Sequence, residues 1–112
     1  MEQTLNAFKV GDVLVYKTYN DGPKTYFYKV VRITATGRYR LQRLEAEETN
    51  IQKRDCPVAH WLNEYIYNVK PTNVPKGKTH LWKPDVFRFE LYNPEKVYTS
   101  EDKYSEDSFL VR

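Results

Sequence analysis

The sequence predicts one mainly β domain of the α+β class, with a single inserted helix near residues 56–69. The first observation is that apolar and polar residues alternate over three consecutive segments, which tight turns separate. The second is that the spacing of apolar residues changes to three and four after Asp55 and returns to two after Pro84. The third is the length of 112 residues, which suits one domain with one core.

The three alternating segments predict a meander of antiparallel strands. The first strand is expected over residues 13–19 and the second over residues 24–34. Residues 20–23, Asn-Asp-Gly-Pro, separate them, because Asn, Asp and Gly tolerate positive φ and Pro ends the ladder. A Thr-Gly pair at residues 36–37 turns the chain again, and the third strand is expected over residues 38–44.

A polar loop over residues 45–54 and then a helix are expected next. Asp55 is suited to cap the start of this helix, and Pro57 is tolerated in its first turn, where the missing N–H has no helical partner. Apolar residues recur along the segment at the spacing of one helical face. They are Val58, Trp61, Leu62, Tyr65, Ile66 and Val69. The β-prone run Tyr65-Ile66-Tyr67 is the feature that argues for a strand instead.

Beyond the helix, residues 70–78 contain two prolines and a glycine, and we expect them to be irregular. Residues 85–92 alternate again and predict a returning strand. We expect residues 1–98 to form the domain and residues 99–112 to form an acidic tail. The tail ends in the apolar residues 109–111, which we expect to pack on the domain or on a neighbouring subunit.

The composition excludes several classes of protein. The single cysteine, Cys56, rules out an internal disulfide framework and suits a reducing compartment. No apolar run approaches the roughly 20 residues of a membrane span, and the first residues lack the layout of a signal peptide. We therefore expect a soluble intracellular protein, in the cytoplasm, the nucleus or an assembled particle. The net charge of +3 is too small to indicate nucleic-acid binding by itself.

Motifs for catalysis and for cofactor binding are missing from the sequence. The chain has only four glycines, and they form no phosphate-binding loop. Cys56 and His60 are four residues apart, but a zinc site needs four ligands and the only other histidine, His80, has no cysteine near it. A Cys-His nucleophile pair also lacks an orienting third group. We therefore expect no enzyme activity, no metal and no cofactor.

Aromatic residues make up 15% of the chain, and ten of them are tyrosines. This surplus exceeds what one small core absorbs, and tyrosine is enriched where protein interfaces bury area. The sequence therefore predicts a non-catalytic binding module or small assembly subunit that acts by protein–protein contact through a tyrosine-rich surface. A viral or phage structural or inhibitor protein is one form of this hypothesis. The predicted contact residues are Tyr16, Tyr19, Tyr26, Tyr28, Phe109 and Leu110.

The alternative hypothesis is a small barrel that binds nucleic acid through a basic strand face. If Arg38 and Arg40 share the solvent face of the third strand, with Tyr39 on the other face, they meet phosphates. Exposed Tyr16 or Tyr28 would then stack on bases. The residues predicted for this interface are Lys29, Arg32, Arg38, Arg40 and Arg43. The competing explanation is that arginines solvate the outer face of a small sheet.

The first third of the chain resembles the opening three strands of a Tudor-type SH3-like barrel. The similarity is carried by residues 8–12 (Phe-Lys-Val-Gly-Asp), 20–22, 26–31 and 37–41. It implies a small barrel and, near the turn at residues 20–22, an aromatic cage for a methylated cation that Tyr19 and Tyr26 would help to form. The family usually continues with a further aromatic residue, whereas this chain continues with the polar loop, so the motif does not supply a complete cage.

Overall fold

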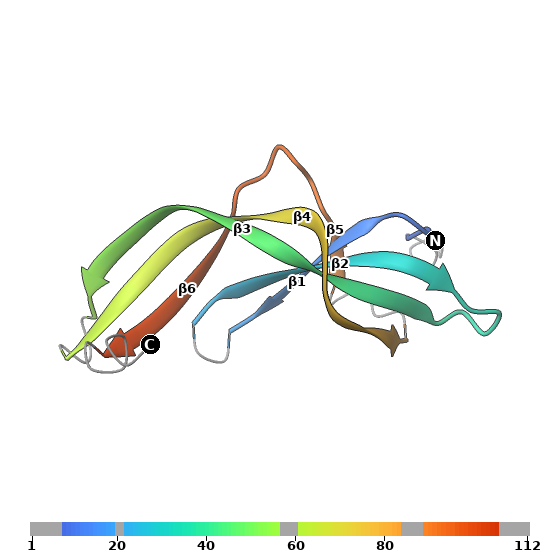
Figure 1. Cartoon of the computed structure of the whole chain (residues 1–112), viewed down its shortest axis with the longest axis horizontal. Coiled ribbons are helices and arrows are strands. Elements are labelled where there is room, and N and C mark those ends of the chain that lie inside the picture. Colours follow the sequence, from blue (N-terminus) through green and yellow to red (C-terminus); the bar gives the residue numbers. More distant parts are fainter. Residues whose placement is uncertain (1–7, 20–21, 57–60, 84–88, 106–112) are drawn as a thin grey trace, which may run out of the picture.

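The computed structural model describes residues 8–19, 22–56, 61–83 and 89–105, with only the backbone described for residues 103–105. They form one antiparallel six-stranded sheet, which confirms the mainly β prediction (Figure 1). The strands are β1 (Val13–Thr18), β2 (Lys24–Ile33), β3 (Tyr39–Asp55), β4 (Leu62–Trp82), β5 (Phe89–Leu91) and β6 (Tyr98–Ser105). Their order across the sheet is β5-β1-β2-β3-β4-β6. The sheet is curled into a half-barrel, a shape compatible with a small barrel fold.

The predicted meander is confirmed as β1, β2 and the first part of β3. Val15 is opposite Phe27 in the β1–β2 pair, and Phe27 is opposite Leu44 in the β2–β3 pair. Gly37 adopts a φ of 82° in the turn between β2 and β3, a conformation that is readily available only to glycine. Local alternation and turn chemistry therefore suffice to build this part of the sheet.

The predicted helix near residues 56–69 is wrong where the structure describes it. Residues 62–69 belong to β4 and pair with β3 on one side and with β6 on the other. Apolar residues at 62, 65, 66 and 69 fit a helical spacing, but the segment also alternates, with Tyr65, Tyr67 and Val69 facing the same core. Aromatic and β-branched residues favour the strand, and two flanking strands satisfy its backbone. No helix occurs in the described residues, while residues 57–60 of the prediction lie outside them.

Two segments predicted as loops, residues 45–54 and 70–78, are instead parts of β3 and β4. Together these strands form a long ribbon that runs through the length of the molecule (Figure 1). The register shifts between Gln42 and Leu44, and again between Leu44 and Ala46, because β4 contains extra residues that bulge out of the ladder. Pro71 and Pro75 are tolerated because β6 pairs with β4 only as far as Val69.

The last two strands are only partly those that the sequence predicts. The returning strand is described as β5 over residues 89–91, and its predicted first residues, 85–88, lie outside the described residues. Residues 99–105, predicted as part of an acidic tail, form most of β6. The apolar end at residues 109–111 lies outside the described residues, so its predicted packing stays a prediction.

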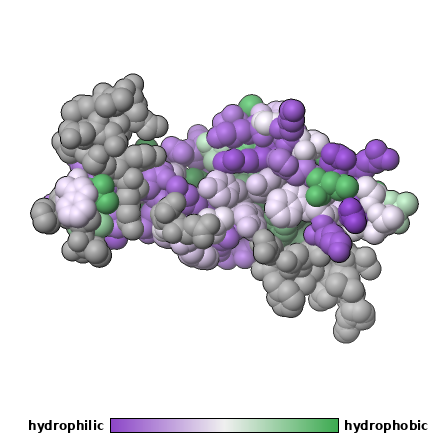
Figure 2. Space-filling model, turned by 90° about the horizontal axis from the view of Figure 1, so that it is seen from below, coloured by the Kyte–Doolittle hydropathy of each residue, from purple (hydrophilic) through white to green (hydrophobic). Residues whose placement is uncertain are grey.

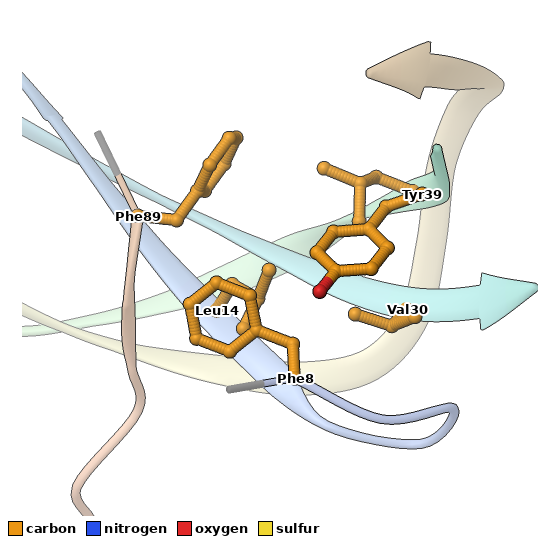
Figure 3. Packing of buried hydrophobic residues seen from close by; sticks show 6 residues of the cluster. Phe8, Leu14, Val30, Tyr39 and Phe89 are labelled. Atoms are coloured by element: carbon orange, nitrogen blue, oxygen red, sulfur yellow. The ribbon is translucent and has the colours of Figure 1, made fainter. Parts of the chain in front are cut away.

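The sheet carries a hydrophobic core on each of its two faces. The first core consists of buried Phe8, Leu14, Val30, Tyr39, Leu41 and Phe89, with half-buried Tyr16, Tyr28 and Trp82 packed against it. Figure 3 shows labelled members of this core gathered from β1, β2, β3 and β5. The second core consists of buried Val15, Phe27, Leu44, Tyr67, Val69 and Tyr98, with Val13, Tyr65 and Tyr92 packed against it. Successive side chains of β1 therefore enter different cores.

The sheet curls in order to cover both cores. At one end, the rings of Tyr16 on β1 and Trp82 on β4 lie 6.4 Å apart between centroids, although two strands separate β1 from β4 in the sheet. At the other end, β2 reaches β6: the Thr25 amide donates to Ser100 Oγ at 2.8 Å, and the Glu101 amide donates to the Pro23 carbonyl at 2.8 Å. The result is an elongated molecule with extents of 50 × 29 × 24 Å.

We predict that Phe27→Ala lowers the free energy of unfolding by about 3–5 kcal/mol, because the ring is fully buried in the second core. Phe27 lies edge-on to both Tyr92 and Tyr98, at 5.7 and 5.9 Å between centroids, so truncation leaves a cavity between them. Tyr19→Ala is the control, since Tyr19 is 69% exposed, and it is expected to change stability by less than about 0.5 kcal/mol. Denaturant titration measures both values, and similar losses would contradict the placement of the second core.

The contact between β2 and β6 gives a second prediction. Ser100→Ala removes the acceptor of the buried Thr25 N–H and is expected to cost about 1–3 kcal/mol. Thr36→Ala is the matched control, because its hydroxyl bonds only Thr34 Oγ1 at an exposed turn, and its expected cost is below about 0.5 kcal/mol. Thermal unfolding of both variants checks this, and equal costs would argue against curling of the sheet at this end.

Candidate functional site

Positive charge is concentrated in one part of the sheet, which we call the basic end and define as residues 25–44 and 71–83. These segments contain eight Lys or Arg residues and no Asp or Glu. They are Lys29, Arg32, Arg38, Arg40, Arg43, Lys76, Lys78 and Lys83. Because β2, β3 and β4 are neighbours in the sheet, the two segments lie side by side. The modest net charge of the chain therefore conceals a local excess.

The remainder of the β3–β4 ribbon and β6 have the opposite balance. Residues 45–55, 62–70 and 98–105 contain seven Asp or Glu residues and four Lys or Arg residues. Several of these charges are already paired, as in the contact of 2.7 Å between Arg54 Nε and the buried Glu64 carboxylate. Figure 2 shows the molecule from below, with hydrophilic residues over most of the described surface and hydrophobic residues in small separate patches.

Three of the predicted nucleic-acid residues share one face of the basic end. Lys29 is opposite Gln42, and Arg32 is directly opposite Arg40, on the face that does not carry the first core. Lys29 and Arg32 are exposed, and Arg40 is half-buried with its Nη1 donating to Thr79 Oγ1 at 3.1 Å. We call Lys29, Arg32 and Arg40 the basic face. The sequence predicts that Arg40 and Tyr39 point to opposite faces of the strand, and they do, since Tyr39 is buried in the first core.

The other two predicted basic residues lie elsewhere. Arg43 is opposite Tyr28, on the face of the first core, and its guanidinium carbon lies 4.5 Å from the ring centroid of Tyr26. This distance is typical of a cation–π contact. Arg38 is exposed in the turn before β3, and its backbone amide donates to Thr34 Oγ1.

The predicted tyrosine-rich surface is largely used inside the molecule. Tyr16 and Tyr28 pack edge-on to each other at 6.5 Å between centroids, and both flank the first core. Tyr26 is half-buried beneath Arg43, whereas Tyr19 is exposed. Phe109 and Leu110, the other predicted contact residues, lie outside the described residues. Most of the described aromatic side chains thus belong to one of the two cores or pack against it.

Burial raises the pKa of the Tyr28 hydroxyl above its ordinary value, while the nearby Arg43 guanidinium lowers it in part. Burial removes water from the phenol and so disfavours its ionised form. The Tyr28 side chain therefore packs against the first core as a neutral group. The pair Tyr28 and Arg43 therefore joins the first core to the charged surface.

The two tyrosines that the resemblance assigns to a cage do not line the same cavity. Tyr19 lines a space of about 120 Å³ together with Pro23 and Val97. Tyr26 lines a different cavity of about 240 Å³, which we call the splay cavity. It lies where β2 leaves β3: their pairing ends at Phe27 and Leu44, and the start of β2 crosses to β6.

The splay cavity is lined by side chains of mixed chemistry. Besides Tyr26 and Tyr67, its polar lining includes Lys24, Arg43, Glu45, Glu48, Lys76 and Asp102. Asp102 accepts from Lys24 Nζ at 3.0 Å and from the Tyr67 hydroxyl. Only Tyr26 and Arg43 of this group are predicted from the sequence. Lys24 and Asp102 come together through the β2–β6 contact, and the others through the pairing of β3 with β4; no local signal in the chain indicates either contact.

The Cys56–His60 pair, for which the sequence predicts neither a zinc site nor a nucleophile pair, is described only in part. Cys56 is a buried free thiol, and His60 lies outside the described residues. In the part of the chain that the structure covers, no three His, Cys, Asp or Glu side chains are arranged to hold a metal ion. A helix long and apolar enough to cross a membrane is likewise missing from the described residues.

No family model matches the chain, and no curated protein and no solved structure matches it. The charge distribution, the basic face and the splay cavity are therefore the features of this protein that indicate a function.

The raised pKa of Tyr28 gives a prediction about alkaline stability. A folded-state pKa above the unfolded value of about 10 contributes stability that is fully present below that value and is lost as the pH rises through the folded pKa. Tyr28→Phe should therefore lose less stability than the parent protein between about pH 9 and pH 12. Denaturant titrations across this range measure the difference, and parallel losses in both proteins would contradict it.

Proposed function

We propose that the protein is a non-catalytic binding module for nucleic acid, and that the basic end of the sheet is its binding surface. The observation that carries this proposal is the group of eight Lys and Arg residues, without an acidic residue among them; six lie on three neighbouring strands, and Arg38 and Lys83 lie next to strand ends. Nucleic acids carry one charge per phosphate, and binding by Lys and Arg releases their condensed counterions. A local excess of cations is the footprint that such a partner requires.

The pairing of Arg32 with Arg40 supports the proposal. Like charges directly opposite each other on neighbouring strands destabilise a sheet. An anion above the basic face would neutralise both guanidinium groups and relieve this repulsion. Phosphate oxygens suit this face, because Gln42 and Thr79, which are opposite each other on β3 and β4, add polar groups next to Arg40.

Protection of an open sheet edge is a simpler explanation for some of the charges, but not for all of the basic face. Lys76 and Lys78 lie on the part of β4 beyond its pairing with β6, where lysine and proline discourage further strand pairing. Lys29 and Arg40, in contrast, lie where β2 and β3 have strand partners on both sides, whereas Arg32 lies beyond the pairing of β2 with β1, which ends at Lys29. Edge protection therefore accounts for the lysines of β4 and also suits Arg32, but it leaves Lys29 and Arg40 unexplained.

The proposal includes an SH3-like or Tudor-like small barrel as the scaffold. The supporting observations are the β1–β2–β3 meander and the return of the sheet upon itself, where Trp82 lies 5.7 Å from Phe89 between ring centroids. Small barrels carry many functions, so the scaffold alone does not choose among partners.

Protein–protein contact is the second proposal, for a small assembly subunit. The observation that favours it is the exposure of large apolar residues near the end of the β3–β4 ribbon, with Ile51 59% and Trp61 65% exposed. Trp is enriched among the residues that dominate binding energy in protein interfaces. In this case the partner would contact the more acidic half of the molecule rather than the basic end.

A salt titration tests the first proposal. We expect DNA and RNA oligonucleotides of unrelated sequence to bind with an affinity that falls log-linearly with salt concentration. The double variant Lys29→Ala/Arg32→Ala should reduce the slope by about 1.4–1.8, because each lost phosphate contact changes it by about 0.7–0.9. Fluorescence anisotropy at four or more salt concentrations measures the slopes.

The matched control is Lys53→Ala/Lys70→Ala, which removes the same charge from exposed residues of the more acidic half. Its slope should equal that of the parent protein. Equal reductions in the two double variants would show a response to net charge alone and would count against the basic face. Absence of binding at low salt would remove the proposal and leave protein contact as the remaining one.

A further inference from the structure

The splay cavity offers a site that phosphate contacts on the basic face do not use. It opens between the first residues of β2 and the middle of β3, next to Arg43 of the basic end. Its volume of about 240 Å³ is below the range of about 300–1,000 Å³ that is typical of drug-sized ligands. A flat group of the size of one nucleobase is the kind of occupant that such a space accommodates.

The side chains around the splay cavity match the base and the phosphate of a nucleotide. Tyr26 supplies an aromatic ring. The guanidinium carbon of Arg43 lies 4.5 Å from the centroid of this ring, and a guanidinium group contacts a nucleobase in the same way. Lys76, which is exposed, adds a second cation for a phosphate.

Glu45 and Glu48 supply carboxylates for the hydrogen-bond donors on base edges. Asp102 is engaged by Lys24 and Tyr67. For the side chains of Glu45 and Glu48, in contrast, no hydrogen bond or ion pair occurs within the part of the chain that the structure describes. Their acceptor oxygens are available to a ligand.

We propose that the splay cavity binds one unpaired base of a single-stranded nucleic acid. The base stacks on the ring of Tyr26 and contacts Arg43, and the neighbouring phosphates contact the basic end. This inference rests on the proposed nucleic-acid function and deepens it, because it names the class of strand. A base inside a duplex is stacked and paired on both sides, so it cannot enter the cavity without being extruded. Single strands present their bases freely, and base–aromatic stacking tolerates any sequence.

The test compares matched probes and matched variants at one low salt concentration. The probes are a single-stranded DNA, an RNA of the same sequence and the corresponding duplex DNA. The parent protein should bind the single strands at least about tenfold more tightly than the duplex, since only they gain a stacked base. Tyr26→Ala should weaken single-strand binding by about 5- to 150-fold and leave duplex binding unchanged. Tyr26→Phe keeps the ring and should bind like the parent.

Tyr19→Ala is the control, because it removes an exposed tyrosine that lines the other cavity, and it should leave both affinities unchanged. A photo-cross-linking measurement on the parent protein does not depend on how the variants fold. A single strand that contains 5-bromouracil should cross-link to the peptide that contains Tyr26.

The outcomes separate this inference from the proposed function. Equal affinity for single strands and duplex, unchanged binding by Tyr26→Ala, or cross-links confined to other peptides would each overturn the base site while the basic face remains. Absence of binding to all three probes would remove both proposals. A preference for DNA over RNA, or the reverse, together with loss of binding in Tyr26→Ala, supports the site and identifies the sugar that the strand carries.

Discussion

Leu14 and Val15 are consecutive residues, both fully buried, and they point to opposite faces of one sheet. This alternation is the constraint on which the structure depends, because a single layer of strands must supply two cores. Neither side chain is left to solvent, so the sheet curls over Leu14 on one face and over Val15 on the other. The long β3–β4 ribbon joins the two curls. The start of β3 and the end of β4 cover the first core, and the start of β4 covers the second.

Two small cores also explain the use of tyrosine. Each core lies close to the surface of a thin sheet, so its outer residues need an apolar ring and a polar end. Tyr16 and Tyr28 flank the first core, and Tyr65 and Tyr92 flank the second. The sequence-based expectation of a tyrosine-rich contact surface assumed one core. With two cores most of the tyrosines take part in packing, and the tyrosine-rich contact surface stays a prediction beside the distribution of exposed charge.

The parts of the fold that follow from local sequence are those whose pairing is local. The β1–β2–β3 meander is predictable because its turns and alternation are contiguous, whereas residues 45–54 become a strand only opposite the distant segment 64–71. The segment 62–69 fits a helical and an extended period equally well, and its neighbours on both sides decide between them. Likewise the basic residues of the site are visible in the sequence, but their division between two faces depends on the bulge at Val31, between the paired residues Val30 and Arg32.

The curling of the sheet also produces the splay cavity, so fold and candidate site have one cause. To cover the second core, the start of β2 must leave β3 and bond to β6, as the two hydrogen bonds of Thr25 to Ser100 and Thr99 show. That departure ends the β2–β3 ladder at Phe27 and Leu44 and opens a polar space beside Tyr26. Backbone hydrogen bonds lost between β2 and β3 are partly replaced by those to β6, which keeps the opening in place without a filling side chain. Hydrogen bonds to β6 and the packing of the second core both hold this opening, and a preformed site suits recognition of a flat group such as a base.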